Sequence, residues 1–246
     1  MKVLKYFGSS LIASLCCGMA ACAPEPEDII KEPDYNDMSQ FKVCSSIFEK
    51  HNSSISTYEY AYDAQKRMTK RKIIPGYGSE TLEISYSADK ILVKRTDEGE
   101  EPIVHTCRLE NGRIVETEDF KISYDGNGHV ISIGPDCTIV WNGDNIKSVS
   151  VGNNTYEYEI SNVDFVRAPM WSYSQLDWDN GWLLRVGLLG KCPRYAPKSY
   201  TTNKGFSGTF SYETKDQNGY VTKCLEHVTD EATSVKTATT YTLTWK

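Results

Sequence analysis

The 246-residue sequence contains little that points to catalysis. It has only four histidines, and it carries no Gly-x-Ser-x-Gly, His-Glu-x-x-His, phosphate-loop or dinucleotide-binding glycine pattern. It has no Cys-x-x-Cys pair, and no histidine stands at metal-ligand spacing from a cysteine. The sequence therefore predicts no metal site and no cofactor, and it favours a protein that is not an enzyme.

Long apolar runs are also scarce, because only the N-terminal segment is continuously apolar. The mean hydropathy is −0.47, which excludes a polytopic helical membrane protein. Hydrophobic residues make up 39% and charged residues 24%, as in ordinary globular proteins. The chain is long enough for one large domain.

Residues 1–22 are typical of a secretory signal peptide. Lys2 and Lys5 supply a positive start, and the apolar stretch after them is shorter than the roughly 20 residues of a membrane-spanning helix. The segment ends Met19-Ala20-Ala21-Cys22, which resembles a bacterial lipobox with Met at its first position. We expect lipid attachment at Cys22, and plain secretion with cleavage after small residues is the alternative.

Residues 23–40 are expected to form a tether. They hold three prolines and six carboxylates against one lysine, a composition that cannot build a core. The acidic residues Glu25, Glu27 and Asp28 resemble a signal that sends lipoproteins of the Bacteroidetes type to the cell surface, although a charge-repelled spacer would look the same. The prediction is an outer-membrane lipoprotein that faces the cell surface or the periplasm and whose Cys22 contacts the membrane.

The charge of the mature chain argues against a nucleic-acid partner. Removal of the signal leaves 25 basic residues against 33 acidic ones, a net charge of −8. One basic run exists, and it can be a site for an anionic glycan or lipid headgroup, or a charged hairpin rim that blocks edge-to-edge pairing. We favour the rim for this run, which consists of Lys66, Arg67, Lys70, Arg71 and Lys72.

Five cysteines belong to the domain, and an odd number allows at most two disulfides. The sequence leaves the pairing open among Cys44, Cys107, Cys137, Cys192 and Cys224. Three of them lie in strand-like runs, where cysteine often serves as a small buried apolar residue: Cys107, Cys137 and Cys224.

From residue 41 to residue 246 the apolar pattern has a period of two. Apolar residues alternate with polar ones, which predicts antiparallel strands with one face on a core and one in water. The clearest runs are Leu82-Ile84-Tyr86, Phe120-Ile122-Tyr124, Tyr156-Tyr158-Ile160, Phe206…Phe210-Tyr212 and Tyr241-Leu243-Trp245.

Tight-turn sequences separate these strands. An apolar residue, a turn with Asn or Asp and Gly, and a second apolar residue recur with anchors 15 to 17 residues apart, which predicts a meander of hairpins. Tyr62-Asp63 and Tyr86…Asp89 are degenerate copies of the unit. We expect an all-β fold in which the antiparallel meander closes, or nearly closes, into a soluble barrel, with a strongly curled sheet as the alternative. Charged residues on the outer face argue against a lipid-facing band.

Residues 163–205 break the pattern and form an apolar insert. Residues 175–189 can form a short helix with Gly190 as its C-cap. The insert is too apolar for a solvated loop. We expect it to plug one end of the barrel or to pack across an open side of the sheet.

Several of these features together resemble one known family. The lipobox, the acidic tether, Leu188-Leu189-Gly190-Lys191 and the run from Phe210 to Lys223 are similar to a family of Bacteroidetes lipoproteins described as a domain of unknown function with a porin-like fold. The resemblance covers residues 41–246. It implies a β-barrel-like fold at the cell envelope and carries over no catalytic residue, because the family has no assigned activity.

The richest candidate site lies in the insert. Aromatic faces with carboxylates between them suit stacking on sugar rings and bonding to hydroxyls, although the same aromatics can fill the barrel mouth. The candidate ligand-binding residues are Trp171, Tyr173, Asp177, Trp178, Asp179 and Trp182. Asp177 and Asp179 could also serve as a general acid and base.

Two further motifs are expected to have no catalytic or metal-binding role. His129, at a hairpin tip, and His227, at a strand end, are expected at the surface or at the barrel rim. The stretch Asp125-Gly-Asn-Gly is expected to be a turn, because it lacks the glutamate that completes a calcium loop.

Three functions remain open from the sequence. The first is a non-catalytic envelope lipoprotein that binds a glycan, a small ligand or a partner protein. The second is a carboxylate-dependent hydrolase, which would need a deep pocket holding two carboxylates with raised pKa values. The third is a purely structural envelope component.

Overall fold

The fold is all-β. We describe it from a computed structural model that covers residues 38–75, 78–169, 183 and 187–246. All of these residues belong to one compact unit, residues 34–246. Within them every pairing between strands is antiparallel, and the only helices assigned as elements are the two short 3₁₀ turns η1 (Met38–Gln40) and η2 (Phe165–Arg167).

The described residues form sixteen strands. In chain order they are β1 (Cys44–His51), β2 (Ser54–Tyr62), β3 (Met68–Pro75), β4 (Glu80–Tyr86), β5 (Lys90–Asp97), β6 (Ile103–Glu110), β7 (Arg113–Glu116), β8 (Ile122–Tyr124), β9 (Val130–Ile133), β10 (Cys137–Asn142), β11 (Asn145–Val151), β12 (Asn154–Asp164), β13 (Tyr195–Thr202), β14 (Phe206–Lys215), β15 (Val221–Asp230) and β16 (Val235–Trp245).

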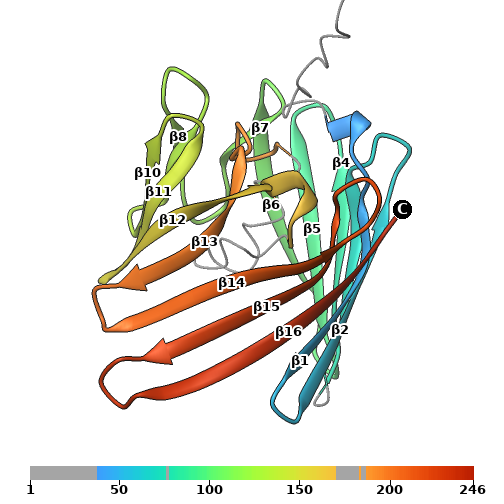
Figure 1. Cartoon of the computed structure of the whole chain (residues 1–246). Helices are drawn as coiled ribbons and strands as arrows, with labels where there is room; N and C mark the ends of the chain where they lie inside the picture. The colour runs from blue at the N-terminus through green and yellow to red at the C-terminus, as the bar shows by residue number, and fades with distance from the viewer. Residues whose placement is uncertain (1–37, 76–77, 170–182, 184–186) are drawn as a thin grey trace, which may run out of the picture. The chain divides into compact units, whose positions relative to one another are not determined.

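All sixteen strands belong to a single curled sheet (Figure 1). Consecutive strands pair with each other, except for β7 and β8, which are the two ends of the sheet, and β1 also pairs with β16. These ends are themselves consecutive in sequence, and an isolated bridge between Glu116 and Lys121 joins them. The meander therefore returns to its own starting edge and forms the nearly closed barrel that the hairpin pattern predicts.

Residues 188–191 complete the seam between the two end strands. The amide of Ile114 in β7 donates to the carbonyl of Leu188 over 2.9 Å, and the amide of Lys191 donates to the carbonyl of Gly128 over 2.9 Å. A further antiparallel bridge joins His129 to Gly190. This segment therefore satisfies backbone groups that β7 and the β8–β9 turn would otherwise leave unpaired.

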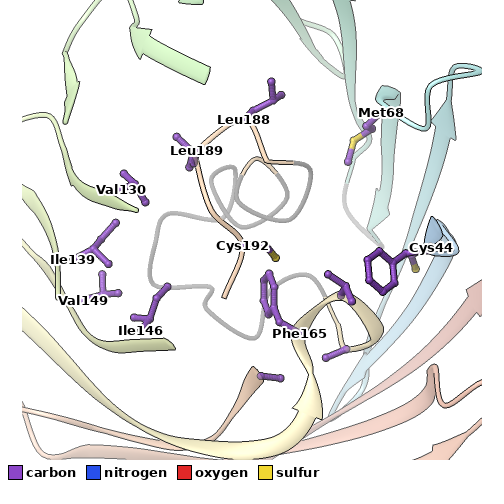
Figure 2. Packing of buried hydrophobic residues seen from close by; sticks show 14 of the residues in the cluster. Cys44, Met68, Val130, Ile139, Ile146, Val149, Phe165, Leu188, Leu189 and Cys192 are labelled. Atoms are coloured by element: carbon purple, nitrogen blue, oxygen red, sulfur yellow. The ribbon is translucent and has the colours of Figure 1, made fainter. Parts of the chain in front are cut away.

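The apolar core lies inside the curled sheet (Figure 2). Phe165, Leu188 and Leu189 stand in the interior, and none of them is more than 9% exposed. Side chains from β9, β10 and β11 approach from one wall, and Cys44 and Met68 approach from the other. The described ends of the insert therefore fill part of the barrel interior.

The expected limits of the insert are wrong. Strand β12 continues to Asp164 and β13 begins at Tyr195, so both strands extend into the range 163–205 that was expected to break the pattern. The proline at position 197 argues against a strand in the sequence, because proline is normally excluded from central strands. It is tolerated here because the register between β12 and β13 shifts beside its partner Ile160. Of the helix expected over 175–189, most lies outside the described residues.

The predicted turns are confirmed. Asn111 and Gly112 have φ values of 51° and 76° between β6 and β7, the positive angles that a two-residue hairpin of this kind requires. Gly128, Gly143 and Gly219 also have positive φ in the turns expected from their sequences. The Asp125 motif forms a turn in which one carboxylate oxygen of Asp125 accepts hydrogen bonds from the backbone amides of Asn127 and His129.

All five domain cysteines are buried thiols in this structure. Cys107, Cys137 and Cys224 lie on β6, β10 and β15 and belong to the apolar core, as the strand pattern predicts. Burial raises the pKa of the Cys224 thiol to about 12, so it stays protonated at neutral pH.

The basic run does not form the edge-blocking rim that we favoured, because β3 is a central strand that pairs with both β2 and β4. Several of its residues take part in ion pairs instead. Arg67 pairs with Asp63 and lies over the ring of Tyr86, and Lys70 pairs with Glu83. Arg71 points the other way and is only 4% exposed. Strand alternation therefore divides the run between two faces, so its charges do not form a single anion site.

The outward faces are rich in hydroxyl and charged side chains. Glu83 on β4, for example, lies between Lys70 and Lys94 on the flanking strands. Among the described residues, no helix is both long enough and apolar enough to cross a membrane.

Candidate functional site

The aromatic and acidic residues that the sequence singles out lie outside the described residues. Trp171, Tyr173, Asp177, Trp178, Asp179 and Trp182 all fall within 170–182, so the structure does not test them. The described part of the chain presents two other features. One is a cluster of tyrosines and carboxylates on the inner face of the sheet, and the other is a groove formed by β12, β13 and β14.

The interior cluster consists of Glu49, Tyr58, Tyr200, Glu226 and Tyr241. Tyr58 donates its hydroxyl proton to Glu49 over 2.7 Å, and Tyr241 donates to Glu226 over 2.8 Å. Tyr200 also hydrogen-bonds to Glu226. Glu49 pairs directly across from Tyr241 in the register of β1 and β16, so the two carboxylates flank one tyrosine.

Strand alternation explains why these carboxylates face inward. Glu49 is two residues after the fully buried Ile47, and Glu226 is two residues after Cys224, which is 1% exposed. Side chains two residues apart in a strand share a face. The same rule places Tyr241 on the inner face, beside the buried Leu243.

Burial controls the protonation of this cluster. It raises the pKa of Glu226, and the nearby charge of Glu49 raises it further, although the hydrogen bonds from Tyr241 and Tyr200 act in the opposite direction. Burial also raises the pKa values of Tyr58, Tyr200 and Tyr241. The three hydroxyls therefore remain proton donors to the carboxylates at neutral pH.

A chain of ion pairs continues along the inner face. Arg71 on β3 lies 2.7 Å from Glu80 on β4, which also lies 3.2 Å from Arg95 on β5. Arg95 then contacts Asp97 at 3.1 Å. Two cations balance two anions here, so the chain stabilises the wall and leaves no excess charge for a ligand.

The expectation that His129 lies at the surface is wrong, because its exposed fraction is only 4%. Its Nδ1 lies 3.0 Å from Asp125, its Nε2 lies 3.6 Å from Asp144, and its ring stacks on Trp141 with centroids 4.4 Å apart. The seam covers it through the bridge to Gly190. His227 is exposed, as expected, but within β15 and not at its end.

The groove lies where the pairing between β12 and β13 loosens. Between the pairs Ile160–Pro197 and Asp164–Tyr195, β12 has three unpaired residues and β13 has one. The resulting hollow has a volume of about 580 Å³. Its lining consists of Ile160, Ser161, Asn162, Val163, Lys198, Phe210, Tyr212 and Lys215, and we call it the β12–β14 groove.

The aromatic part of this groove is held in place by its surroundings. Phe210 and Tyr212 are stacked, with ring centroids 6.4 Å apart and planes inclined by 14°. Phe210 is 7% exposed, and the hydroxyl of Tyr212 donates to the carbonyl of Pro197 over 2.6 Å. Ser161 likewise donates to the carbonyl of Ala196 over 2.7 Å, so the polar edge is anchored to β13.

The lining residues limit what this groove can do. Aromatic and aliphatic side chains, one amide, two hydroxyls and two ammonium groups line it, and none of its lining residues is Asp, Glu, His or Cys. It therefore has the groups for binding a ligand, and its lining offers no pair of carboxylates and no histidine or cysteine for catalysis. Among the described residues, no group of three or more His, Cys, Asp or Glu is arranged to hold a metal ion.

The comparisons with known proteins support the fold. A crystal structure of a porin-like protein from Bacteroides uniformis is similar, with a TM-score of 0.57, 16% identity, and coverage of 82% of this chain and 96% of that one. A second porin-like protein, from Bacteroides vulgatus, matches with a TM-score of 0.45, 11% identity, and coverage of 82% and 98%.

The first similarity shows a porin-like fold and, at this identity, the fold alone. No protein-family model matches the sequence, and no curated protein is similar to it.

Sequence reasoning missed the interior carboxylates, although a signal for them exists. In the runs Ile47-Phe-Glu49 and Cys224-Leu-Glu226 the acidic residue comes two positions after a buried residue, so both side chains lie on the same face of the strand. The groove had no such signal, because Asn162 and Lys198 are brought together only by the shift in strand register.

Proposed function

We propose that the chain is a non-catalytic binding protein of the bacterial cell envelope that holds a sugar-containing ligand in the β12–β14 groove. The observation that carries this proposal is the lining of the groove. A fixed pair of aromatic rings lies beside an amide and two ammonium groups, and aromatic faces with polar groups at the rim suit the apolar face and the hydroxyls of a sugar ring.

The hydrolase alternative gains no support from the described residues. It requires a pocket that holds two carboxylates, and the β12–β14 groove contains none. Glu226 does have a raised pKa, but its carboxylate accepts hydrogen bonds from two tyrosines of the interior cluster. A purely structural role is consistent with the packed core, but it does not account for the groove.

Glycan-array binding of the full chain in detergent tests this proposal. We expect binding that the Asn162→Trp variant abolishes, because the exposed side chain of Asn162 lines the groove and an indole there would fill it. Thr209→Trp is the matched control, since Thr209 is exposed on the opposite face of β14 from Phe210. The proposal fails if no glycan binds, or if both variants bind like the wild type.

The envelope location rests on the lipobox and tether expected from the sequence, and the similarity to porin-like proteins is consistent with it. We propose that Cys22 carries the lipid and that the protein belongs to the outer membrane. Two acyl chains would hold the protein stably, whereas one chain gives only weak attachment.

Replacement of the proposed lipid-bearing cysteine tests the anchor. Cys22→Ser should move the protein from the membrane fraction to the soluble fraction, whereas Cys17→Ser should leave it in the membrane. Mass spectrometry of the mature N-terminus provides the second measurement, and an unmodified Cys22 there would disprove the anchor.

A further inference from the structure

The β12–β14 groove differs in charge from the rest of the protein. The mature chain has a net charge of −8, yet the charged residues that line the groove are Lys198 and Lys215, both positive. Both are exposed. A ligand that enters the groove therefore meets two cations and no carboxylate from the lining.

Lys198 has a weakly held carboxylate partner, and the acidic residues next to Lys215 in sequence are paired with other lysines. Glu159 is the carboxylate paired with Lys198, at 4.0 Å, and both side chains are more than two-thirds exposed. Glu213, two residues before Lys215, is paired with Lys223 on β15 at 2.8 Å. Asp216, which follows Lys215, is paired with Lys42 at 2.7 Å. The exposed Lys198–Glu159 pair is weak, so a ligand can displace it at little cost.

The cations and the aromatic rings of the groove suit two different chemical groups of a single ligand. The stacked rings of Phe210 and Tyr212 present an apolar face, and Asn162 and Ser161 add polar groups beside it. A neutral sugar would use the rings and the amide but would form no ion pair with either lysine. A sugar ring that carries an anionic group uses the whole lining.

We infer that the ligand of the groove is an acidic saccharide, whose carboxylate or sulfate pairs with Lys198 and Lys215 while a sugar ring packs on Phe210 and Tyr212. This inference rests on the proposed function and adds the charge of the ligand. Carboxylated and sulfated saccharides share this chemistry, and separate probes distinguish them.

Calorimetric titration of the full chain in detergent tests the inference with three probes. They are a tetragalacturonate, its fully methyl-esterified form, which keeps the rings and removes the charge, and a chondroitin sulfate tetrasaccharide. We expect at least one acidic probe to bind, and we expect the uncharged ester to bind about tenfold more weakly than the tetragalacturonate if carboxylate is the preferred anion. Binding of the sulfated probe alone would identify sulfate as that anion.

Substitution of the lysines supplies the second readout. Lys198→Gln and Lys215→Gln should each weaken acidic-probe binding by about threefold, and the loss should shrink as salt is raised from about 50 to about 500 mM. Lys236→Gln is the control, because this exposed lysine of β16 does not line the groove.

The possible results separate this inference from the proposed function. Equal binding of the acid and its ester, with no effect of either lysine variant, overturns the inference. So does the absence of binding by every acidic probe. If neutral glycans then bind and Asn162→Trp blocks them, the proposed function stands without the inference, whereas no glycan binding of any kind overturns both.

Discussion

Tyrosine hydroxyls tie strands of this barrel to the backbone of neighbouring strands. Tyr62, Tyr86, Tyr124 and Tyr212 each donate to a main-chain carbonyl 10 to 18 residues earlier, over 2.6 to 2.7 Å. Each ring packs against the core while its hydroxyl reaches the backbone. At these four positions tyrosine, unlike phenylalanine, supplies both an apolar ring and a hydrogen-bond donor.

Removal of one such hydroxyl should have a measurable cost. Tyr86→Phe keeps the ring but leaves the carbonyl of Met68 without that donor, so we expect a loss of about 1 kcal/mol in the free energy of unfolding. Thermal unfolding measures it as a fall in Tm of about 2–4 °C. Tyr156→Phe is the control and should change Tm little, because Tyr156 has no hydroxyl hydrogen bond among the described residues.

The raised pKa of Glu226 makes stability depend on pH. The folded state holds this proton more tightly than the unfolded state, whose carboxyl has a pKa near 4.5. The contribution of Glu226 is therefore most favourable below pH 4.5 and is lost as the pH rises through the folded-state pKa.

Glu226→Gln should remove this dependence, because an amide stays neutral and still accepts the hydrogen bond from Tyr241. We expect the Tm of the variant to increase relative to that of the wild type as the pH rises above 4.5. Below that pH we expect the two proteins to have the same Tm. Glu157→Gln, an exposed site on β12, controls for general loss of negative charge. A Tm difference that does not change with pH would contradict the prediction.

At the scale of single elements, the segment 188–191 depends on Gly190. Its φ is +81°, and a Cβ there would lie 2.3 Å from the carbonyl oxygen of Gly128. That contact is far too short, so a side chain at position 190 would push its backbone away from that of His129 and break the β-bridge between them. The close approach of two backbones therefore requires glycine at this position.

Gly190→Ala should lower the free energy of unfolding by about 3 kcal/mol, because it adds a backbone clash to the strain of positive φ. Gly187→Ala is a matched control, with φ of +77° but no atom closer than 3.9 Å to its Cβ. We expect the control to lose only about 1 kcal/mol. Denaturant unfolding compares the two, and equal losses would show that the seam contributes nothing.

At the scale of the whole molecule, long strands form one side of the sheet, and short strands with few pairing contacts form its two ends. Strands β14, β15 and β16 have 10 or 11 residues each, whereas β7 and β8, at the ends of the sheet, have 4 and 3. Few contacts join the described end strands: the Glu116–Lys121 bridge, the segment 188–191 and the hydrogen bond from the hydroxyl of Tyr124 to the carbonyl of Ile114. Opening of the barrel should therefore begin between β7 and β8.

Hydrogen exchange tests this order of opening. We expect the amides of β7 and β8 to exchange fastest among the strands and those of β15, which is paired on both sides along its length, to exchange slowest. Mass spectrometry of peptides from the exchanged protein gives the comparison. Protection of β7 and β8 equal to that of β15 would mean that the barrel opens as a whole.

Much of the fold could be predicted from local sequence. The alternation in Leu82-Ile84-Tyr86 and the turn at Asn111-Gly112 depend only on neighbouring residues, because strand faces and tight turns are local properties of the chain. The limits of β13 could not be predicted in this way. Pro197 is compatible with a strand only because β12 changes register beside it.

The candidate site divides in the same way. The sequence by itself determined that acidic residues fall on the apolar faces of β1 and β15, since the spacing of two from Ile47 and Cys224 sets the face. Only the tertiary structure decided that Tyr241 lies between those carboxylates and that Asn162 meets Lys198 and Lys215 at one groove. Contacts between strands far apart in sequence depend on register and closure, and no local pattern encodes either.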